Sequence, residues 1–235
     1  QIEQNRKLAF LGEMSAVLAH ELRNPLASIS GSIQLLRRDL PLGTGDRRLM
    51  DIIERGRNQL ETLARDFLLL APSRAAVQID AIDAVDMINE VLESVRLSED
   101  WNGDVAVSGR LEYRRLIRGN RKDVRQAIQN VVTNALQAMH EGGALAIETR
   151  PGEDGDFVEI EIRDTGRGID PVNMVYVREP FFTTREGGTG LGLVIVDRVM
   201  ESHGGYFHIN SNAGEGTRVV MGFPAAQKEP DEEKH

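Results

Sequence analysis

Apolar residues that recur at alternating steps of three and four place the strongest constraint on the fold of this chain. One such seam occupies residues 8–36, and a second occupies residues 49–70. The spacing predicts a helix over residues 3–39 and another after the breaker-rich turn 41–46. The seam positions are Leu8, Leu11, Ser15, Leu18, Leu22, Leu26, Ile29, Ile33 and Leu36, then Leu49, Ile53, Gly56, Leu60, Leu63, Phe67 and Leu70. Two such helices joined by a short turn predict an antiparallel helical hairpin.

A single hairpin cannot cover both of its apolar stripes, so another surface must pack against it. A two-fold dimer that forms a four-helix bundle is the solution that the pattern favours. The alternative is a monomeric hairpin that packs on the following domain.

His20 lies on the face of the first predicted helix that is opposite the seam, because it is two residues away from a seam leucine on either side. An exposed histidine on a helix is usually an ordinary surface residue, but its neighbours change that interpretation. Glu21 is an adjacent carboxylate, and Asn24 lies one turn further along the same face. Pro25 costs roughly 3 kcal/mol in a helix interior, which indicates a bend that the helix tolerates for a reason.

Composition and charge narrow the class of function. The net charge of −9 argues against a surface that binds the phosphate backbone of nucleic acids. The chain has no cysteine, so disulfides and thiolate metal sites are excluded, in keeping with a reducing cytoplasm. The longest uninterrupted apolar run, residues 67–71, is far shorter than the ~18 residues that cross a bilayer, and no signal peptide is visible.

The start of the chain predicts a missing upstream region. The seam is already running at Leu8, and the chain opens at Gln1 without an initiator methionine. A helix that begins without a capping signal is typical of a segment of a longer coiled coil. We therefore expect the cytoplasmic part of a larger protein, with membrane attachment only through an upstream region.

Beyond a linker at residues 71–76, the periodicity changes to mixed helix and strand. The pattern predicts helices over 84–97, 120–140 and 191–202, strands over 77–80, 105–107, 111–117, 144–149 and 157–163, a loop over 164–188, and a final hairpin of 206–210 with 217–223. The strands over 105–107 and 111–117 resemble a pair.

These elements predict three parts of the chain. Residues 1–72 form the helical hairpin for dimerisation, and residues 77–225 form an α/β sandwich. Residues 226–235 are charged and lack apolar anchors, so we expect a disordered tail.

Two stretches of the second part carry polar groups suited to a ligand. Asn130 and Asn134 lie one turn apart on a predicted helix, and their amide oxygens are hard, neutral ligands of the kind that Mg²⁺ accepts. Asp164 follows a predicted strand in D-T-G-R-G, where its carboxylate can accept a hydrogen bond from an exocyclic amine such as that of adenine. Gly166 and Gly168 let the backbone turn tightly there. Each signal is weak alone, because such asparagine pairs and turns are common.

A third stretch, E-G-G-T-G-L-G-L at residues 186–193, opens a predicted helix. Free backbone N–H groups and the positive end of a helix dipole suit such a turn to phosphate binding. The spacing differs from that of the P-loop, which disfavours a P-loop kinase or GTPase. The long preceding loop contains F-F-T-T-R at residues 181–185, which favours a mobile lid with an aromatic anchor and one cation.

Together these stretches resemble the H, N, G1, F and G2 boxes of sensor histidine kinases, in the family's order and over nearly the whole chain. The matching residues are H-E-L-R-N-P at His20, N-x-x-x-N at Asn130, D-x-G-x-G at Asp164, F-F-T-T at Phe181 and G-x-G-x-G at Gly188. The run E-P-F-F-T-T-R-E-G-G-T-G-L-G-L resembles especially the nitrogen-regulation and pilus-regulation type. One position departs from the pattern: Arg178 stands just before the F box, where an aromatic or aliphatic residue is expected.

The resemblance implies a protein-histidine kinase that uses ATP and Mg²⁺, forms a homodimer and passes a phosphoryl group to an aspartate of a response regulator. It implies that His20 is the phosphoacceptor, Glu21 the base that takes its proton, and Asn24 the residue that orients water for phosphatase activity. No nucleic acid is implied as a partner.

The resemblance also implies the nucleotide contacts. Asp164 would recognise adenine, while Asn134 and Asn130 would serve Mg²⁺ and the phosphates. The other implied cofactor-binding residues are Gly166, Gly168, Phe182, Thr184, Arg185, Gly188, Gly190, Leu191 and Gly192, with Arg185 near the γ-phosphate.

Two other classes of function remain open from the sequence. One is a scaffold that dimerises and docks a regulator without turnover, against which the complete set of boxes argues. The other is an ATP-driven conformational clamp related to the topoisomerase and mismatch-repair ATPases, which would have no use for the His20 motif.

Overall fold

The computed structural model describes residues 27–38, 43–69, 79–98, 101, 103–185 and 188–226. Contacts within the chain divide it into two compact units. The helical unit comprises residues up to 76 together with 183–191, and the α/β unit comprises residues 77–182 and those from 192 onward.

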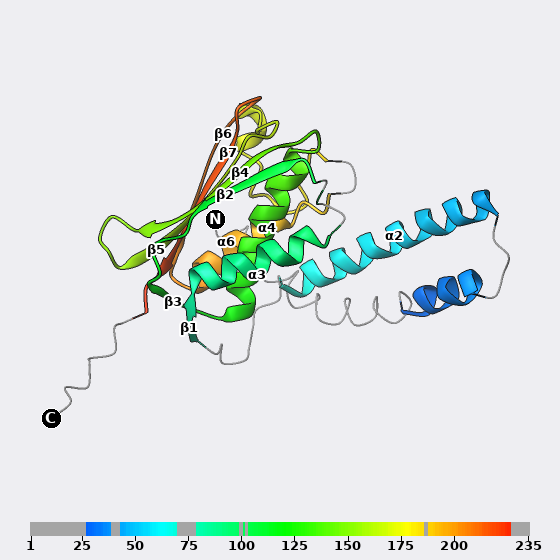
Figure 1. The fold of residues 1–235 in the computed structure, drawn as a ribbon, viewed down its shortest axis with the longest axis horizontal. Coiled ribbons are helices and arrows are strands. Elements are labelled where there is room, and N and C mark those ends of the chain that lie inside the picture. Colours follow the sequence, from blue (N-terminus) through cyan, green and yellow to red (C-terminus); the bar gives the residue numbers. More distant parts are fainter. Residues whose placement is uncertain are drawn as a thin grey trace. The chain divides into compact units, whose positions relative to one another are not determined.

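The helical unit contains an antiparallel pair formed by the helical residues 27–38 and helix α2, Thr44–Leu69 (Figure 1). Arg37 bonds to Asp51 at 2.6 Å and to Glu54 at 2.8 Å, while Arg57 donates to the Ser30 hydroxyl at 3.1 Å. Residue 37, near the end of the first helix, pairs with residues 51 and 54, whereas the earlier residue 30 pairs with the later residue 57. The two helices are therefore antiparallel, and the predicted hairpin is confirmed. Helix α2 begins inside the predicted turn, and the predicted helical residues 3–26 lie outside the described part of the chain.

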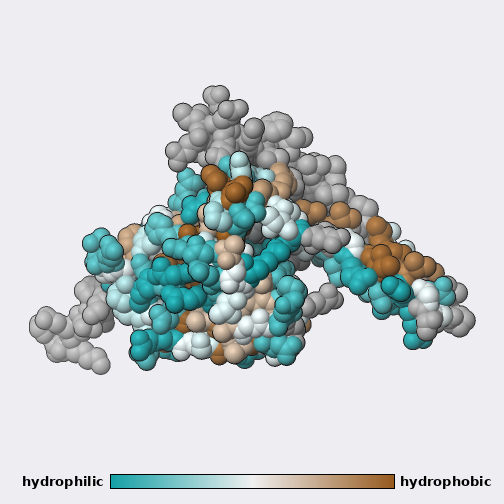
Figure 2. Space-filling model, turned by 90° about the horizontal axis from the view of Figure 1, so that it is seen from above, coloured by the Kyte–Doolittle hydropathy of each residue, from teal (hydrophilic) through white to brown (hydrophobic). Residues whose placement is uncertain are grey.

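Among the described residues, one apolar stripe of this pair is exposed. Leu49 is 60% exposed, Ile53 is 47% exposed and Leu60 is 48% exposed, and Leu35 on the preceding helix is 51% exposed. Figure 2 shows apolar residues gathered along this part of the molecule. Adjacent exposed apolar side chains at helical spacing are typical of a surface that packs against another chain.

The α/β unit is built on a five-stranded sheet with the order β2-β4-β5-β7-β6. Strands β2 and β4 are parallel, and every other neighbouring pair is antiparallel. The strands are β2 Val105–Arg110, β4 Gly143–Pro151, β5 Phe157–Asp164, β6 Tyr206–Asn212 and β7 Gly216–Pro224. A separate two-stranded sheet pairs β1, Asp80–Asp83, with β3, Leu116–Gly119.

Two sequence predictions about strands are wrong in detail. The segment predicted as a strand over 111–117 becomes β3 at Leu116–Gly119, and it pairs with β1 and not with the strand before it. Strand β2 pairs instead with β4, which follows some thirty residues later in the chain. Strand β1 starts at Asp80, the last residue of the predicted strand 77–80, of which residues 77 and 78 lie outside the described part of the chain. Local alternation marks a strand but does not identify its partner.

Helices α3, α4 and α6 lie together on one side of the large sheet (Figure 1). The helices are α3 Ala84–Arg96, α4 Arg121–Ala138, α5 Pro171–Met174 and α6 Gly192–Ser202. Alternate residues of the sheet are buried toward these helices, among them Ile147, Ile160, Ile162, Met221 and Phe223. Buried side chains of α4 and α6 complete this core, which fixes the end of β5 beside α4.

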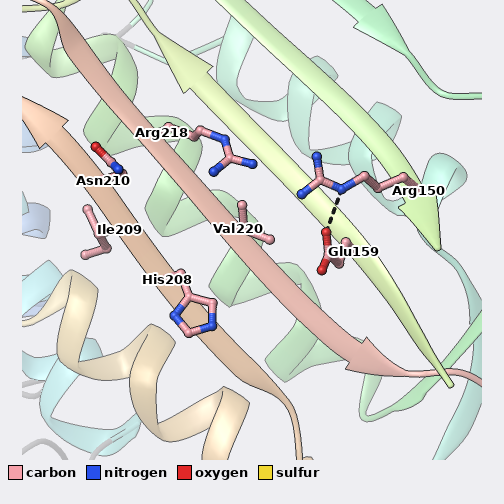
Figure 3. A pocket seen from close by; sticks show the side chains of 7 residues that line it. All are labelled: Arg150, Glu159, His208, Ile209, Asn210, Arg218 and Val220. Atoms are coloured by element: carbon pink, nitrogen blue, oxygen red, sulfur yellow. Dashed lines mark hydrogen bonds and ion pairs between the residues drawn. The ribbon is translucent and has the colours of Figure 1, made fainter. Parts of the chain in front are cut away.

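In the described part of the α/β unit, the opposite face of the sheet carries charged side chains. Figure 3 shows Arg150, Glu159, Arg218 and Val220 on this face. Glu161 lies at its centre and accepts from Arg150 at 2.5 Å and from Arg218 at 2.7 and 2.8 Å. The hydrogen bond from Arg218, together with the charges of both arginines, lowers the pKa of Glu161 to about 2, against the opposing effect of burial.

We expect Glu161→Gln to destabilise the protein at neutral pH and not in strong acid. The carboxyl has a lower pKa in the folded protein than its ordinary 4.5. Its contribution to the free energy of unfolding is therefore complete above about pH 4.5 and is lost as the pH falls toward 2. The lowered pKa of Glu161 sets an upper limit of about 3 kcal/mol on the loss of unfolding free energy at pH 7. Urea unfolding at pH 7 and pH 3 measures the effect, with Glu153→Gln in the exposed β4–β5 turn as control. An equal deficit at both pH values would contradict this account.

Candidate nucleotide site

Asp164, the last residue of β5, points to the helix side of the sheet and is only 5% exposed. Its Oδ1 atom accepts hydrogen bonds from the backbone N–H groups of Gly166 at 2.9 Å and Thr217 at 3.2 Å. Burial raises the pKa of this carboxyl, and the two backbone hydrogen bonds oppose the rise. Because both of these bonds use Oδ1, the carboxylate is held in a fixed orientation by backbone groups.

The glycines after Asp164 allow the chain to pass between two neighbours. A Cβ atom at Gly166 would lie 2.7 Å from the carbonyl oxygen of Ala138, at the end of α4. Gly168 has a φ of +64°, and a Cβ atom there would lie 1.9 Å from the carbonyl oxygen of Asn212. The intervening Arg167 donates its N–H to Ala138 and accepts from the N–H of Gly214. The turn is thus fixed between α4 and the β6–β7 hairpin.

The two asparagines of α4 face the start of α6. Asn130 donates from Nδ2 to the carbonyl oxygen of Gly192 at 3.0 Å, and its Oδ1 accepts from Gln126 at 2.8 Å. A Cβ atom built on Gly192 would lie 3.7 Å from the Asn134 Nδ2 atom. Gly192, the first residue of α6, therefore lies next to the amides of α4.

The structure places the predicted site residues in different parts of the chain. The α/β unit holds Asn130, Asn134, Asp164, Gly166, Gly168, Phe182 and Gly192, and the helical unit holds Thr184, Arg185, Gly188, Gly190 and Leu191. His20, Glu21 and Asn24 lie outside the described residues, as do residues 186 and 187.

The glycine-rich stretch has local features of a tight turn. The Thr183 hydroxyl accepts from the N–H of Arg185 at 3.1 Å, and Thr189 accepts from the N–H of Leu191 at 3.3 Å. Gly190 has a φ of +66°, which favours glycine. These residues form the end of the long loop that the sequence predicts to be a lid.

Sequence reasoning missed two residues that shape the site. Thr217 of β7 is the register partner of Asp164 and donates the second N–H to it. Gly216 has a φ of +87°, and a Cβ atom there would lie 2.0 Å from the Asp164 carbonyl oxygen. The only signal in the sequence is a glycine directly before the last predicted strand.

These features define an α/β domain with a buried, fixed carboxylate at the end of β5, which follows a helical hairpin in the same chain. Two family models match it: the His Kinase A (phospho-acceptor) domain over residues 10–76, and the histidine kinase-, DNA gyrase B- and HSP90-like ATPase over residues 119–227. The chain belongs to the histidine kinases.

Relatives agree with this assignment. The chain is 32% identical to sporulation kinase A of Bacillus subtilis (strain 168) over 225 residues, which cover 94% of this chain and 36% of that protein. It is 30% identical to the sensor histidine kinase ZraS of Escherichia coli (strain K12) over 240 residues, which cover 98% of this chain and 49% of ZraS. The chain thus spans between a third and a half of the length of these relatives.

Solved structures of the same family share the fold. Full-length ShkA in complex with AMPPNP matches with a TM-score of 0.74 and 26% identity, covering 93% of this chain and 47% of ShkA. Histidine kinase ThkA in complex with the response regulator protein TrrA matches with a TM-score of 0.64 and 25% identity, covering 95% of this chain and 64% of that one. The predicted fold class, a helical hairpin followed by an α/β sandwich, is confirmed.

Two negative findings concern the described residues alone. Within the described ranges, no helix is both long and apolar enough to cross a membrane. Nor do these ranges contain a cluster of three or more His, Cys, Asp or Glu side chains that could hold a metal ion. The amide oxygens of α4 are donors of the kind that Mg²⁺ accepts.

Proposed function

We propose that this chain uses ATP to phosphorylate His20 and then passes the phosphoryl group to an aspartate of a response regulator. The observation that carries the proposal is the fixed, buried carboxylate of Asp164 in the same unit as the amides of α4, in a chain that also has His-Glu-x-x-Asn on its first predicted helix. ShkA was solved with AMPPNP and ThkA with a response regulator, which supports both the nucleotide and the partner.

The α/β unit supplies the contacts to adenine and Mg²⁺. Asp164 accepts a hydrogen bond from the adenine amine, because its orientation is fixed by the backbone of Gly166 and Thr217. Asn134, with Asn130, serves Mg²⁺ and the phosphates, and Asn130 must first exchange its Oδ1 bond from Gln126. Mg²⁺, when bound, neutralises charge on the phosphates. The backbone N–H groups of the glycine-rich turn and the guanidinium of Arg185 contact the phosphates.

The chemical step is an in-line displacement at the γ-phosphorus. A ring nitrogen of neutral His20 forms the new N–P bond while the bond from phosphorus to the bridging oxygen breaks, and ADP leaves. Glu21 accepts the imidazole proton. Histidine has an ordinary pKa of ~6.5, so it is mostly neutral near pH 7 and needs orientation more than activation.

Two further roles belong to the same proposal. Asn24 orients a water molecule for dephosphorylation of the regulator, since its amide offers both donors and an acceptor one turn from His20. The exposed stripe that includes Leu49, Ile53 and Leu60 packs against a second copy of the chain to form a four-helix bundle.

Incubation with γ-labelled ATP and Mg²⁺ tests the proposal against its alternatives. A histidine kinase retains label on the protein in an acid-labile, alkali-stable form. A clamp-type ATPase releases free phosphate and leaves the protein unlabelled. A scaffold neither becomes labelled nor releases phosphate. Either of the last two results would overturn the proposed function.

Asp164→Asn is expected to weaken ATP binding and to reduce the preference for ATP over GTP. The amide replaces an acceptor-only carboxylate with a mixed donor and acceptor, and a hydrogen bond that involves a charged group is worth about 1.5–3 kcal/mol, or roughly 10- to 150-fold in affinity. Titration with a fluorescent ATP analogue, with ATP and GTP as competitors, measures both effects. Asp154→Asn in the exposed β4–β5 turn is the matched control. Equal affinity of the parent protein for ATP and GTP would refute the role of Asp164.

A further inference from the structure

The segment that leads from the Asp164 turn toward the F-F-T-T stretch is tied at both ends to strand β6. We define residues 169–182 as the lid base. At its first end, the N–H of Ile169 donates to the Ser211 hydroxyl at 2.9 Å. Near its second end, Arg178 donates from a guanidinium nitrogen to the carbonyl oxygen of Phe207 at 2.9 Å. Ser211 and Phe207 belong to the same strand, so β6 holds the lid base along its length.

Arg178 makes three contacts with two neighbouring elements. Besides its hydrogen bond to the Phe207 carbonyl, its guanidinium carbon lies 4.6 Å from the centroid of the Phe207 ring, which is a cation–π distance. A second guanidinium nitrogen lies 3.3 Å from a carboxylate oxygen of Asp197 on α6. The side chains of Arg178 and Asp197 are 42% and 45% exposed, so the ion pair alone contributes little. The contacts with the 5%-exposed Phe207 therefore hold the arginine in place.

The position of β6 explains why an arginine fits there. It is the last strand in the order β2-β4-β5-β7-β6, so within the described residues the carbonyls that point away from β7 have no strand partner. A planar guanidinium can stack on the Phe207 ring and bond to such a carbonyl at the same time, which neither lysine nor an apolar residue can do. An aromatic or aliphatic residue, the type expected here, would leave that carbonyl without this donor.

The chain beyond Arg178 is compact up to the F-F-T-T stretch. The N–H of Glu179 donates to the Tyr176 carbonyl at 2.8 Å, and the N–H of Phe182 donates to the Glu179 carbonyl at 3.2 Å. The rings of Tyr176 and Phe182 lie 5.6 Å apart. Phe181 adopts a φ of 67°, a left-handed conformation that only surrounding structure can maintain. An anchor at Arg178 thus lies three residues before Phe181, the first residue of the F-F-T-T stretch.

We propose that Arg178 is a positioning residue, which fixes the lid base on β6 and α6 and thereby sets how readily the lid engages ATP. This inference rests on the proposed function, because the lid matters only if the site binds ATP. Arg178 touches neither nucleotide nor His20 in this role. Loss of the contacts of Arg178 makes the lid base more mobile. ATP binding must then order the lid base, and the entropic cost of this ordering lowers the affinity for ATP.

The test compares Arg178→Ala, Arg178→Lys and Asp197→Asn in the full chain by autophosphorylation kinetics and hydrogen exchange. We expect Arg178→Ala to raise the KM for ATP about five- to tenfold and to lower kcat less than twofold, since the acceptor chemistry is untouched. Arg178→Lys keeps the charge but lacks the planar guanidinium that stacks on the Phe207 ring. We therefore expect it to reverse less than half of the rise in KM that Arg178→Ala causes. Asp197→Asn removes only the exposed ion pair and changes the KM less than twofold.

Hydrogen exchange gives a readout that does not require activity. Amides of the lid base should exchange faster in Arg178→Ala than in the parent, while those of β4 and β5 should be unchanged. An unchanged KM with unchanged exchange in the lid base would overturn the proposal, as would full rescue by lysine. If the parent protein itself fails to bind ATP or to become labelled, the proposed function fails, whereas the exchange comparison still decides whether Arg178 anchors the lid base.

Discussion

Replacing His20 with Gln is expected to abolish autophosphorylation and to leave ATP affinity unchanged. The substitution removes the nitrogen that forms the bond to phosphorus, and loss of a catalytic nucleophile lowers rates by at least about a thousandfold. The nucleotide contacts we assign to Asp164 and Asn134 belong to the α/β unit, which does not contain residue 20. Labelling with γ-labelled ATP measures the first effect, and titration with a fluorescent ATP analogue measures the second.

The control is His208→Gln, the same substitution at an exposed histidine on the outer face of the sheet (Figure 3). It should retain full labelling. Measurable label on purified His20→Gln would show that another residue accepts the phosphoryl group. A parallel loss of ATP affinity would show that His20 contributes to nucleotide binding or to folding.

The second large effect is expected at Gly168, where Ala should destabilise the α/β unit by several kcal/mol. The added Cβ atom would lie 1.9 Å from the carbonyl oxygen of Asn212, so the Asp164 turn or the β6–β7 hairpin must move. The φ of +64° adds a conformational cost of about 1 kcal/mol for a residue with a side chain. Overpacking against backbone typically costs about 1–3 kcal/mol more. Urea unfolding and ATP titration should both show the loss.

Gly214→Ala separates the cost of the positive φ from the cost of the steric overlap. Gly214 also has a positive φ, +80°, but a Cβ atom there would meet nothing within 4 Å. It should therefore cost only the conformational term of about 1 kcal/mol. Equal destabilisation by the two substitutions would contradict the close approach at Gly168.

Helices were predicted from the sequence more closely than strand pairing, and the reason is that helical signals are local. Helix α3 was predicted over 84–97 and extends from Ala84 to Arg96. Asp83 caps it by accepting from the N–H groups of Val85 and Asp86, a signal contained within four residues. The four-residue helix α5 was missed inside the predicted loop, although Asp170 and Pro171 form a capping pair at its start.

The site shows the same limit. The glycines at 166 and 168 could be predicted as a turn, but the groups that require them could not. Those groups are the Ala138 and Asn212 carbonyls, which approach from a helix end and a hairpin far away in the chain. Arg178 is the clearest case, since the sequence marks it as a departure, and only the structure shows the Phe207 ring and the edge carbonyl that it contacts. Non-local contacts of this kind have no period in the sequence.

Mapping the labelled residue tests the central claim most directly. The full chain is incubated with ATP and Mg²⁺, digested under mildly alkaline conditions that preserve phosphohistidine, and analysed by mass spectrometry with a fragmentation method that retains the modification. We expect one phosphoryl group on His20, which disappears when the sample is acidified. A phosphoryl group on another residue, or an unmodified His20 peptide after ATP has been consumed, would contradict this claim.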